Sequence, residues 1–241
     1  SSFSKIGKPE EAAKYCLLLE KSGHREIIAA NSVMNAHAKA SDLDGAEKWL
    51  ARIQARQLSP DTITYTSLLN AAARAEQPKR AVKIFDDMAK SNVEHDARAA
   101  NCVLDAFAKS GDAHGCARQF DIMFDTSPPA DSNANSTPKK GKLKPTEVSF
   151  NSVMSAFAHT EDASNTLKWF NKLVEYGLEP TSITYNSLFY VYGAVGDVTA
   201  AEELFEKSID SYLRREKKLS SENKGYEKRD RDSLEFLIES T

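Results

Sequence analysis

The sequence has few of the residues that build disulfide frameworks or metal sites. Its 241 residues include three cysteines and five histidines, and none stands at a spacing typical of a metal site or of a disulfide framework. We therefore expect no metal and no other cofactor, and interpret Cys16, Cys102 and Cys116 as reduced thiols in buried positions. No apolar run approaches the roughly 18 residues that a membrane-spanning helix needs, which predicts no direct insertion into a membrane.

Motifs for catalysis are also missing. Neither the nucleophile motif G-x-S-x-G nor a glycine-rich phosphate loop occurs, and no pair of acidic residues stands at a useful spacing. We therefore predict no catalytic residues and no enzymatic activity in this chain. Neither sign of charge is in large excess, because the formal net charge is only −3. Such a balance counts against nucleic acid as a partner unless the charge is unevenly distributed.

What the sequence does contain is an internal repeat of 35 residues. The successive copies cover residues 27–61, 62–96, 97–146, 147–181 and 182–216. The third copy is longer because it carries an insertion at about 125–142, and the last copy is degenerate. A fixed period of this length is typical of repeat architectures, in which each unit stacks only on its neighbours.

The ends of the chain and the insertion depart from the repeat. Residues 1–26 match only the second half of a preceding unit, and residues 217–241 form a charged linker with a possible C-terminal capping helix. The insertion is rich in Pro, Ser, Asn and Lys and has no apolar periodicity, so we expect it to be a disordered surface loop. Since the sequence opens inside a unit, we expect it to be part of a longer protein.

Each copy has the pattern of two helices joined by a turn. Apolar residues recur at i, i+3 and i+4 in both halves, first at Tyr65, Leu68, Leu69 and Ala72 and then at Ala81, Ile84, Phe85 and Met88. Asp and Ser in the turns supply helix N-caps, and Gly177 before Pro180 predicts a left-handed residue at a helix end. Alternating helices with short connections predict an all-α fold, an α-solenoid of helix–turn–helix units.

The units resemble the pentatricopeptide repeat family. The resemblance rests on the 35-residue length, the openings TYTSL at 64–68 and TYNSL at 184–188, the second-helix pattern A-E-x-x-F and the closing P-D, and it covers nearly all of residues 5–216. The tetratricopeptide repeat is a poorer match because its period is 34 residues. The resemblance implies a right-handed superhelix, single-stranded RNA as partner with one nucleotide per repeat, and a location in the mitochondrion or chloroplast.

The resemblance also implies which side chains read the bases. In the family a base edge is read by the residue after the first-helix aromatic together with the last residue of the same unit. The first set, the readout column, contains Asn31, Thr66, Asn101, Asn151 and Asn186. The last residues, the closing residues, are Asp61, Asp96, Thr146 and Thr181. The family pattern assigns uracil to Asn31 with Asp61 and guanine to Thr66 with Asp96, and we suggest a pyrimidine for the two Thr-closed units.

Two further columns complete the predicted site. Apolar residues that sandwich each base in the family form the sandwich column, Ile28, Ile63, Val148 and Ile183, from which Arg98 departs. Cations near the first-helix C-termini form the basic column, Lys39, Arg74, Lys109 and His159, suited to phosphates. Without any ligand, cations also complement a helix C-terminus and short polar residues cap helix starts, so these alternatives stay open.

Two functions from different classes follow. The favoured one is sequence-selective binding of single-stranded RNA in organellar RNA processing, stability or translation. The alternative is a structural subunit that grips protein in a large organellar complex, such as a ribosome or a membrane complex. The polar and basic columns favour the first, whereas the net acidity, Arg98 and the Thr-closed units favour the second.

Overall fold

The computed structural model describes residues 8–21, 27–125 and 142–209. Their helices are α2 (Pro9–Lys21), α3 (Ile27–Lys39), α4 (Leu43–Ala55), α5 (Thr62–Arg74), α6 (Pro78–Lys90), α7 (Ala97–Lys109), α8 (Ala113–Met123), α9 (Glu147–His159), α10 (Ala163–Glu175) and α11 (Ser182–Val195). Within these described ranges the only β-structure is an isolated bridge between Phe124 and Leu143. The all-α prediction is confirmed.

The chain divides into two compact units, Ser1–Val191 and Tyr192–Thr241. In the second unit residues 198–209 are helical, and the Asp197 carboxylate caps this helix by accepting a hydrogen bond from the Ala200 backbone at 3.0 Å. The expected charged linker and capping helix at 217–241 lie outside the described residues, as do most of the expected insertion loop and the end of the degenerate last repeat.

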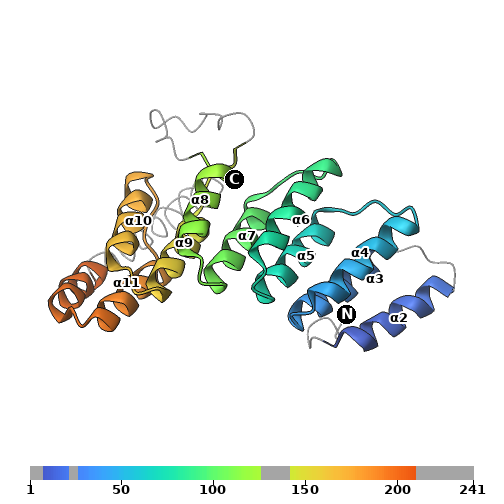
Figure 1. Cartoon of the computed structure of the whole chain (residues 1–241), viewed down its shortest axis with the longest axis horizontal. Coiled ribbons are helices and arrows are strands. Elements are labelled where there is room, and N and C mark those ends of the chain that lie inside the picture. The colour runs from blue at the N-terminus through green and yellow to red at the C-terminus, as the bar shows by residue number, and fades with distance from the viewer. Residues whose placement is uncertain (1–7, 22–26, 126–141, 210–241) are drawn as a thin grey trace, which may run out of the picture. The chain divides into compact units, whose positions relative to one another are not determined.

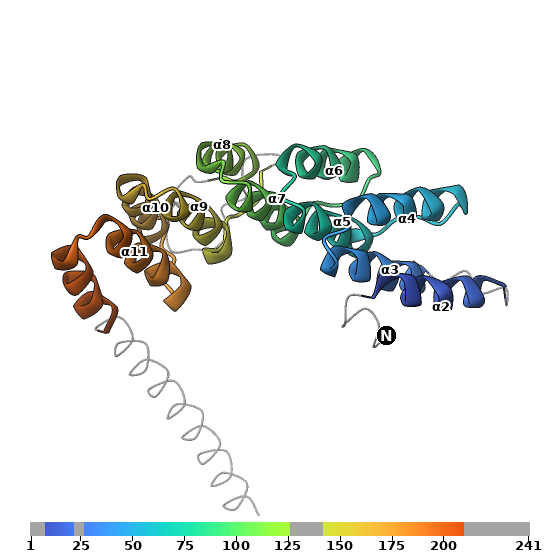
Figure 2. The ribbon, with the colours of Figure 1, turned by 60° about the horizontal axis from the view of Figure 1, so that its bottom comes forward.

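The first unit is a stack of helical hairpins in two layers. Helix α3 packs on α5, α5 on α7 and α7 on α9, so the first helices of successive hairpins lie side by side (Figure 1). The second helices α4, α6 and α8 each pack on their own first helix and on the next one, as α4 does on α3 and α5. Figure 2 shows α4, α6 and α8 along one side of α3, α5 and α7. This arrangement is that of an α-solenoid.

Small side chains fill much of the buried face of the first helices. One column of alanines is completely buried and contains Ala36, Ala71, Ala106 and Ala156. A second buried column on the same helices contains Val33, Leu68, Val103 and Val153. Because each column repeats with the sequence period, every junction between units uses the same contact, and one hairpin alone would leave both columns exposed to water.

Each connection between helices that the structure describes in full contains one residue with a left-handed backbone. Those after the first helices are Ser41, Glu76, Gly111, Glu161 and Gly196, and those after the second helices include Gln57, Asn92 and Gly177. Gly177 has φ of 87°, which confirms the conformation predicted for it. These turns reverse the chain within a few residues and keep successive helices antiparallel.

The insertion lies between α8 and α9 and leaves the stack of helices continuous. Its flanks are joined by two backbone hydrogen bonds of 2.9 Å, from Asp125 to the Leu143 carbonyl and from Leu143 to the Met123 carbonyl. Beside this bridge Phe120 is completely buried, with its ring centroid 4.9 Å from those of Phe150 and Trp169. The chain therefore leaves and re-enters the stack at one point, and α9 packs on α7 as α7 packs on α5.

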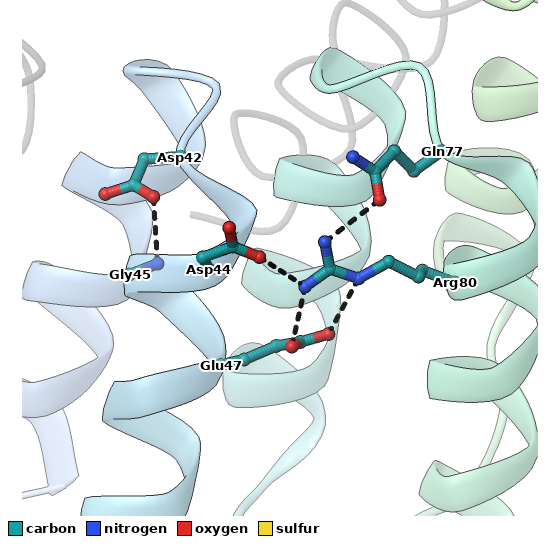
Figure 3. A network of polar contacts seen from close by, with 6 residues as sticks. All are labelled: Asp42, Asp44, Gly45, Glu47, Gln77 and Arg80. Atoms are coloured by element: carbon teal, nitrogen blue, oxygen red, sulfur yellow. Dashed lines mark hydrogen bonds and ion pairs between the residues drawn. The ribbon is translucent and has the colours of Figure 1, made fainter.

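One polar cluster links two neighbouring second helices. The Arg80 guanidinium on α6 contacts Asp44 at 2.7 Å and Glu47 at 2.6 Å, both on α4, and also donates to the Gln77 side chain at 2.9 Å (Figure 3). Hydrogen bonds to Glu47 raise the pKa of Arg80, with smaller contributions from Asp44. The cluster connects the first two full units through their outer layer.

We expect Arg80→Met to destabilise this junction. The substitution keeps the alkyl stem and removes both ion pairs, so the free energy of unfolding should fall by about 1 kcal/mol, the upper range for partly exposed ion pairs. Urea unfolding followed by circular dichroism measures the change. The loss should shrink in high salt because screening weakens the pairs in the wild type.

A matched control is Lys83→Met on the same helix. Lys83 is exposed and makes no hydrogen bond or ion pair with other residues that the structure describes. Equal losses in the two variants would contradict a specific role for the Arg80 cluster.

Candidate nucleic-acid interface

The readout column lies one turn inside the first helices. Asn31 and Asn151 are buried, with 6% and 8% of their surface exposed, whereas Asn186 is exposed. Thr66 and Asn101 are partly buried. An amide that is buried in a protein requires hydrogen-bond partners, and in this chain those partners come from the closing residue of the same unit and from the next unit.

Asn31 is joined to its predicted partner Asp61. The Asn31 amide Nδ2 donates to Asp61 Oδ1 at 3.1 Å, and the Thr64 hydroxyl lies 2.7 Å from Asn31 Oδ1. Asp61 also caps α5 by accepting from the Thr64 backbone N–H at 2.8 Å. Because a carboxylate only accepts hydrogen bonds, the nitrogen side of the Asn31 amide must face Asp61.

The Thr-closed units repeat this arrangement with weaker contacts to the closing residue. Asn151 Nδ2 lies 3.5 Å from Thr181 Oγ1, at the outer limit of a hydrogen bond, while the Thr184 hydroxyl donates to Asn151 Oδ1 at 2.8 Å. Asn101 Oδ1 accepts from the Ser149 hydroxyl at 2.7 Å, and Ser149 Oγ lies 3.2 Å from Thr146 Oγ1. The 50-residue copy thus keeps the contact to the next unit, whereas the structure shows no hydrogen bond between Asn101 and Thr146 among its described residues.

Thr66 and Asp96 each bond within their own helix or cap. The Thr66 hydroxyl donates to the Thr62 carbonyl of its own helix at 2.7 Å, and Asp96 caps α7 by accepting from the Ala99 backbone at 2.7 Å. The structure shows no hydrogen bond between these two predicted partners among its described residues. The Arg98 Nε lies 3.4 Å from Asp96 Oδ2, so the two side chains form an ion pair.

The sandwich column is unusually exposed for large apolar residues. Ile28, Ile63, Val148 and Ile183 have between 56% and 71% of their surface exposed. Each is the second residue of its helix, three positions before a readout residue. Scattered exposed apolar residues need no explanation, but a column repeated with the unit period creates a row of apolar contacts beside the polar readout column. Arg98, with 76% of its side chain exposed, occupies the same position in α7.

The basic column is less uniform than the sequence suggests. The Lys109 ammonium lies 2.6 Å from Asp105 Oδ2, so this cation is paired. The His159 ring lies 5.6 Å from that of Tyr190, and its Nδ1 is 3.4 Å from the Ser155 hydroxyl. Asp105 precedes Lys109 by four residues on one helix, and that spacing was the sequence signal that the prediction missed.

Hydrogen bonding and burial set the ionisation of several groups. Burial alone would raise the pKa of Asp61, but hydrogen bonds from the Thr64 backbone, the Thr64 side chain and the Asn31 amide outweigh it, and the pKa lies below its ordinary value. Burial raises the pKa of Cys102 to about 12 and also raises that of Cys116, so these thiols stay protonated at neutral pH.

Metal sites and membrane-spanning helices are the other features considered for the described residues. The described part of the chain contains no group of three His, Cys, Asp or Glu side chains that could hold a metal ion. Among the described helices, none has both the length and the apolar character to cross a bilayer.

The repeat itself matches known families. The PPR repeat family matches residues 25–74, 62–109 and 145–193, and the PPR repeat matches residues 183–213. The chain belongs to the PPR repeat family. A curated PPR relative, pentatricopeptide repeat-containing protein At3g49170, chloroplastic, of Arabidopsis thaliana, is 21% identical over 212 residues, which are 88% of this chain and 22% of the relative.

Solved PPR structures share the fold. Maize PPR10, in a crystal structure with an 18-nt psaJ RNA element, has a TM-score of 0.68 at 18% identity, covering 84% of this chain and 28% of PPR10. The PPR domain of Arabidopsis thaliana protein-only RNase P 1, solved in complex with tRNA, has a TM-score of 0.54 at 14% identity, covering 73% of this chain and 86% of that domain. The chain spans about a quarter of the length of the curated relatives it matches.

We expect Asp61→Ala to show a pH-dependent loss of stability. A depressed carboxyl pKa adds stability that is full above the unfolded value of 3.8 and is lost as the pH falls through the folded value. The variant should therefore be less stable by about 1 kcal/mol at neutral pH and approach the wild type in acid. Thermal unfolding at several pH values measures this difference.

Thr181→Ala is the matched control, because it removes a closing residue and helix cap that carries no carboxyl. Its loss should not vary with pH over the acid range. A pH-independent gap for Asp61→Ala would contradict the role of the carboxylate in the Asn31 cluster.

Proposed function

We propose that this PPR chain binds single-stranded RNA sequence-selectively, with bases held between sandwich residues and read by the readout column. The observation that carries the proposal is the pairing of a row of exposed apolar side chains with a row of hydrogen-bonded amides at the same helix ends. A base offers two apolar faces and a polar edge, and this combination of surfaces suits both.

The hydrogen bonds support different selectivity in different units. Asn31 is held by an acceptor-only carboxylate, so it presents one fixed pattern of donor and acceptor, for which the family pattern assigns uracil. Thr66 offers a hydroxyl and is assigned guanine with Asp96. Asn101 is held by the Ser149 hydroxyl and Asn151 by the Thr184 hydroxyl. Their units close with Thr, whose hydroxyl both donates and accepts, and we propose a less strict preference for pyrimidines there.

The process and location are part of the same proposal. We propose a role in RNA processing, stability or translation inside a mitochondrion or chloroplast, supported by the organelle names that several relatives carry. We propose no catalysis by this chain, although the protein-only RNase P neighbours show that PPR repeats also occur in proteins named as RNases. The geometry supports binding and positioning of RNA rather than its cleavage.

The direct test is selection from a random single-stranded RNA pool at physiological salt. We expect the purified chain to enrich a short core of uracil, guanine and pyrimidine. Thr66→Asn should replace guanine by uracil at the second position, and Asn31→Ala should weaken the preference at the first. Retention of RNA without any sequence preference would contradict selective binding, and no retention would favour the protein-gripping alternative.

A second test concerns charge on the first-helix face. Asp105→Asn releases Lys109 from its ion pair and removes a negative charge from that face. We expect RNA affinity to rise by about two- to threefold at low salt, and the slope of log Kd against log salt to steepen by about 0.7, the value for one added phosphate contact. Fluorescence anisotropy with labelled RNA at several salt concentrations measures both.

Asp86→Asn is the control, since it removes the same charge from an exposed site on α6, in the outer layer. Its RNA affinity should stay at the wild-type value. An equal gain in both variants would mean that net charge alone, rather than the basic column, attracts the RNA.

A further inference from the structure

Three buried hydroxyls donate hydrogen bonds to asparagines of the readout column. Thr64, Ser149 and Thr184 are the third residues of α5, α9 and α11, and all are completely buried. None belongs to the predicted readout, sandwich or basic columns. Each lies within 2.8 Å of the amide oxygen of the readout asparagine in the preceding unit.

The hydroxyls have a fixed set of partners. Each accepts a hydrogen bond from the backbone N–H of the closing residue before it, at 3.2, 3.1 and 2.9 Å for Thr64, Ser149 and Thr184. In the two Thr-closed units the hydroxyl proton is then directed to the Asn oxygen. At Thr64 the proton is shared, because Asp61 Oδ1 lies 2.8 Å away, but there the carboxylate itself orients Asn31.

Among the readout residues whose following first helix is described, the one not followed by such a hydroxyl is threonine rather than asparagine. Asn186 has no following first helix among the described residues. Ala99 is the third residue of α7, and the preceding readout residue is Thr66, whose hydroxyl is satisfied by its own helix. Asparagine therefore stands wherever a hydroxyl follows, at Asn31, Asn101 and Asn151, and threonine stands where a methyl group follows. This match links residue types in neighbouring units.

The physical need for a hydroxyl comes from the symmetry of the amide. A flipped asparagine occupies the same volume but exchanges its donor and acceptor, which would invert the pattern offered to a base edge. We infer that Ser149, Thr184 and Thr64 are positioning residues for base selection, each holding the amide oxygen of the preceding unit's asparagine so that the nitrogen side faces its closing residue. This inference rests on the proposed RNA binding and deepens it.

Ser149 and Ala99 occupy equivalent positions in α9 and α7, so each residue can be exchanged for the other. Ser149→Ala copies Ala99 and should lower the preference for pyrimidine over purine at the third nucleotide by about three- to tenfold, the factor that the net value of one hydrogen bond corresponds to. Ser149→Thr, which copies Thr64 and Thr184, should restore it. Kd values are measured for RNAs that differ only at this nucleotide.

Ser152→Ala is the matched control, because the Ser152 hydroxyl bonds only the Val148 carbonyl of its own helix, at 3.0 Å, among the partners that the structure shows. Its base preference should equal that of the wild type. Loss of helix capping in Ser149→Ala would lower stability without changing the ratio of two Kd values, so the ratio separates positioning from folding.

The gain-of-function arm compares the single variant Thr66→Asn with the double variant that carries both Thr66→Asn and Ala99→Ser. The double variant recreates the Asn101 and Ser149 pair in another unit, and should discriminate uracil from guanine at the second nucleotide about three- to tenfold better than Thr66→Asn alone. Ala99→Ser alone should leave the wild-type preference unchanged. This arm decides the question even if Ser149→Ala folds poorly.

The outcomes separate the two levels of the proposal. A wild-type preference that Ser149→Ala leaves intact, with equal discrimination by the single and double Thr66 variants, would overturn the positioning role and leave selective RNA binding standing. A wild type without any base preference would overturn both.

Discussion

Everything in this chain depends on the contact between neighbouring first helices. Successive first helices pack on one another, their alanine column of Ala36, Ala71, Ala106 and Ala156 is completely buried, and short polar groups meet across the junction. Asn31 and Thr64 can therefore share a hydrogen bond of 2.7 Å although they belong to different hairpins. A larger residue in this column would overpack the junction and also move the polar pair apart.

Because the polar pairs cross a junction, a single hairpin does not contain a complete site. The amide comes from one unit, the closing residue ends that unit and caps the next helix, and the buried hydroxyl lies inside the next helix. The insertion shows how strictly this geometry is kept: Ser149 reaches Asn101 at 2.7 Å although their sequence separation is 48 residues rather than 33. The backbone bridge between Asp125 and Leu143 closes the insertion at its base and makes this possible.

The repeat period was sufficient to predict the all-α solenoid, since apolar residues with a fixed period must face neighbouring units. It was not sufficient to predict burial. Tyr15 and Phe205 stand at repeat-equivalent positions to the completely buried Phe120, yet both are 57% exposed, because a pattern names the face of a helix and not how much of a side chain is covered. The site was predicted one residue at a time, and its columns remain predictions. The hydroxyls were missed because threonine and serine at helix starts read as ordinary caps, and only the structure shows that each also touches an amide in the preceding unit.

The junction between the units 62–96 and 97–146 departs from the pattern in several linked positions. Thr66 replaces asparagine, Ala99 replaces the hydroxyl, and Arg98 replaces the apolar sandwich residue. Each change removes one element of the network, but a guanidinium is planar and can stack on a base while its charge attracts phosphate. On the proposed function, the junction between these two units would rely on stacking and charge where the other junctions rely on a fixed amide. The net charge of −3 then poses no contradiction, since most of the selectivity would come from short neutral hydrogen bonds and cationic groups would be needed only at a few places along the face.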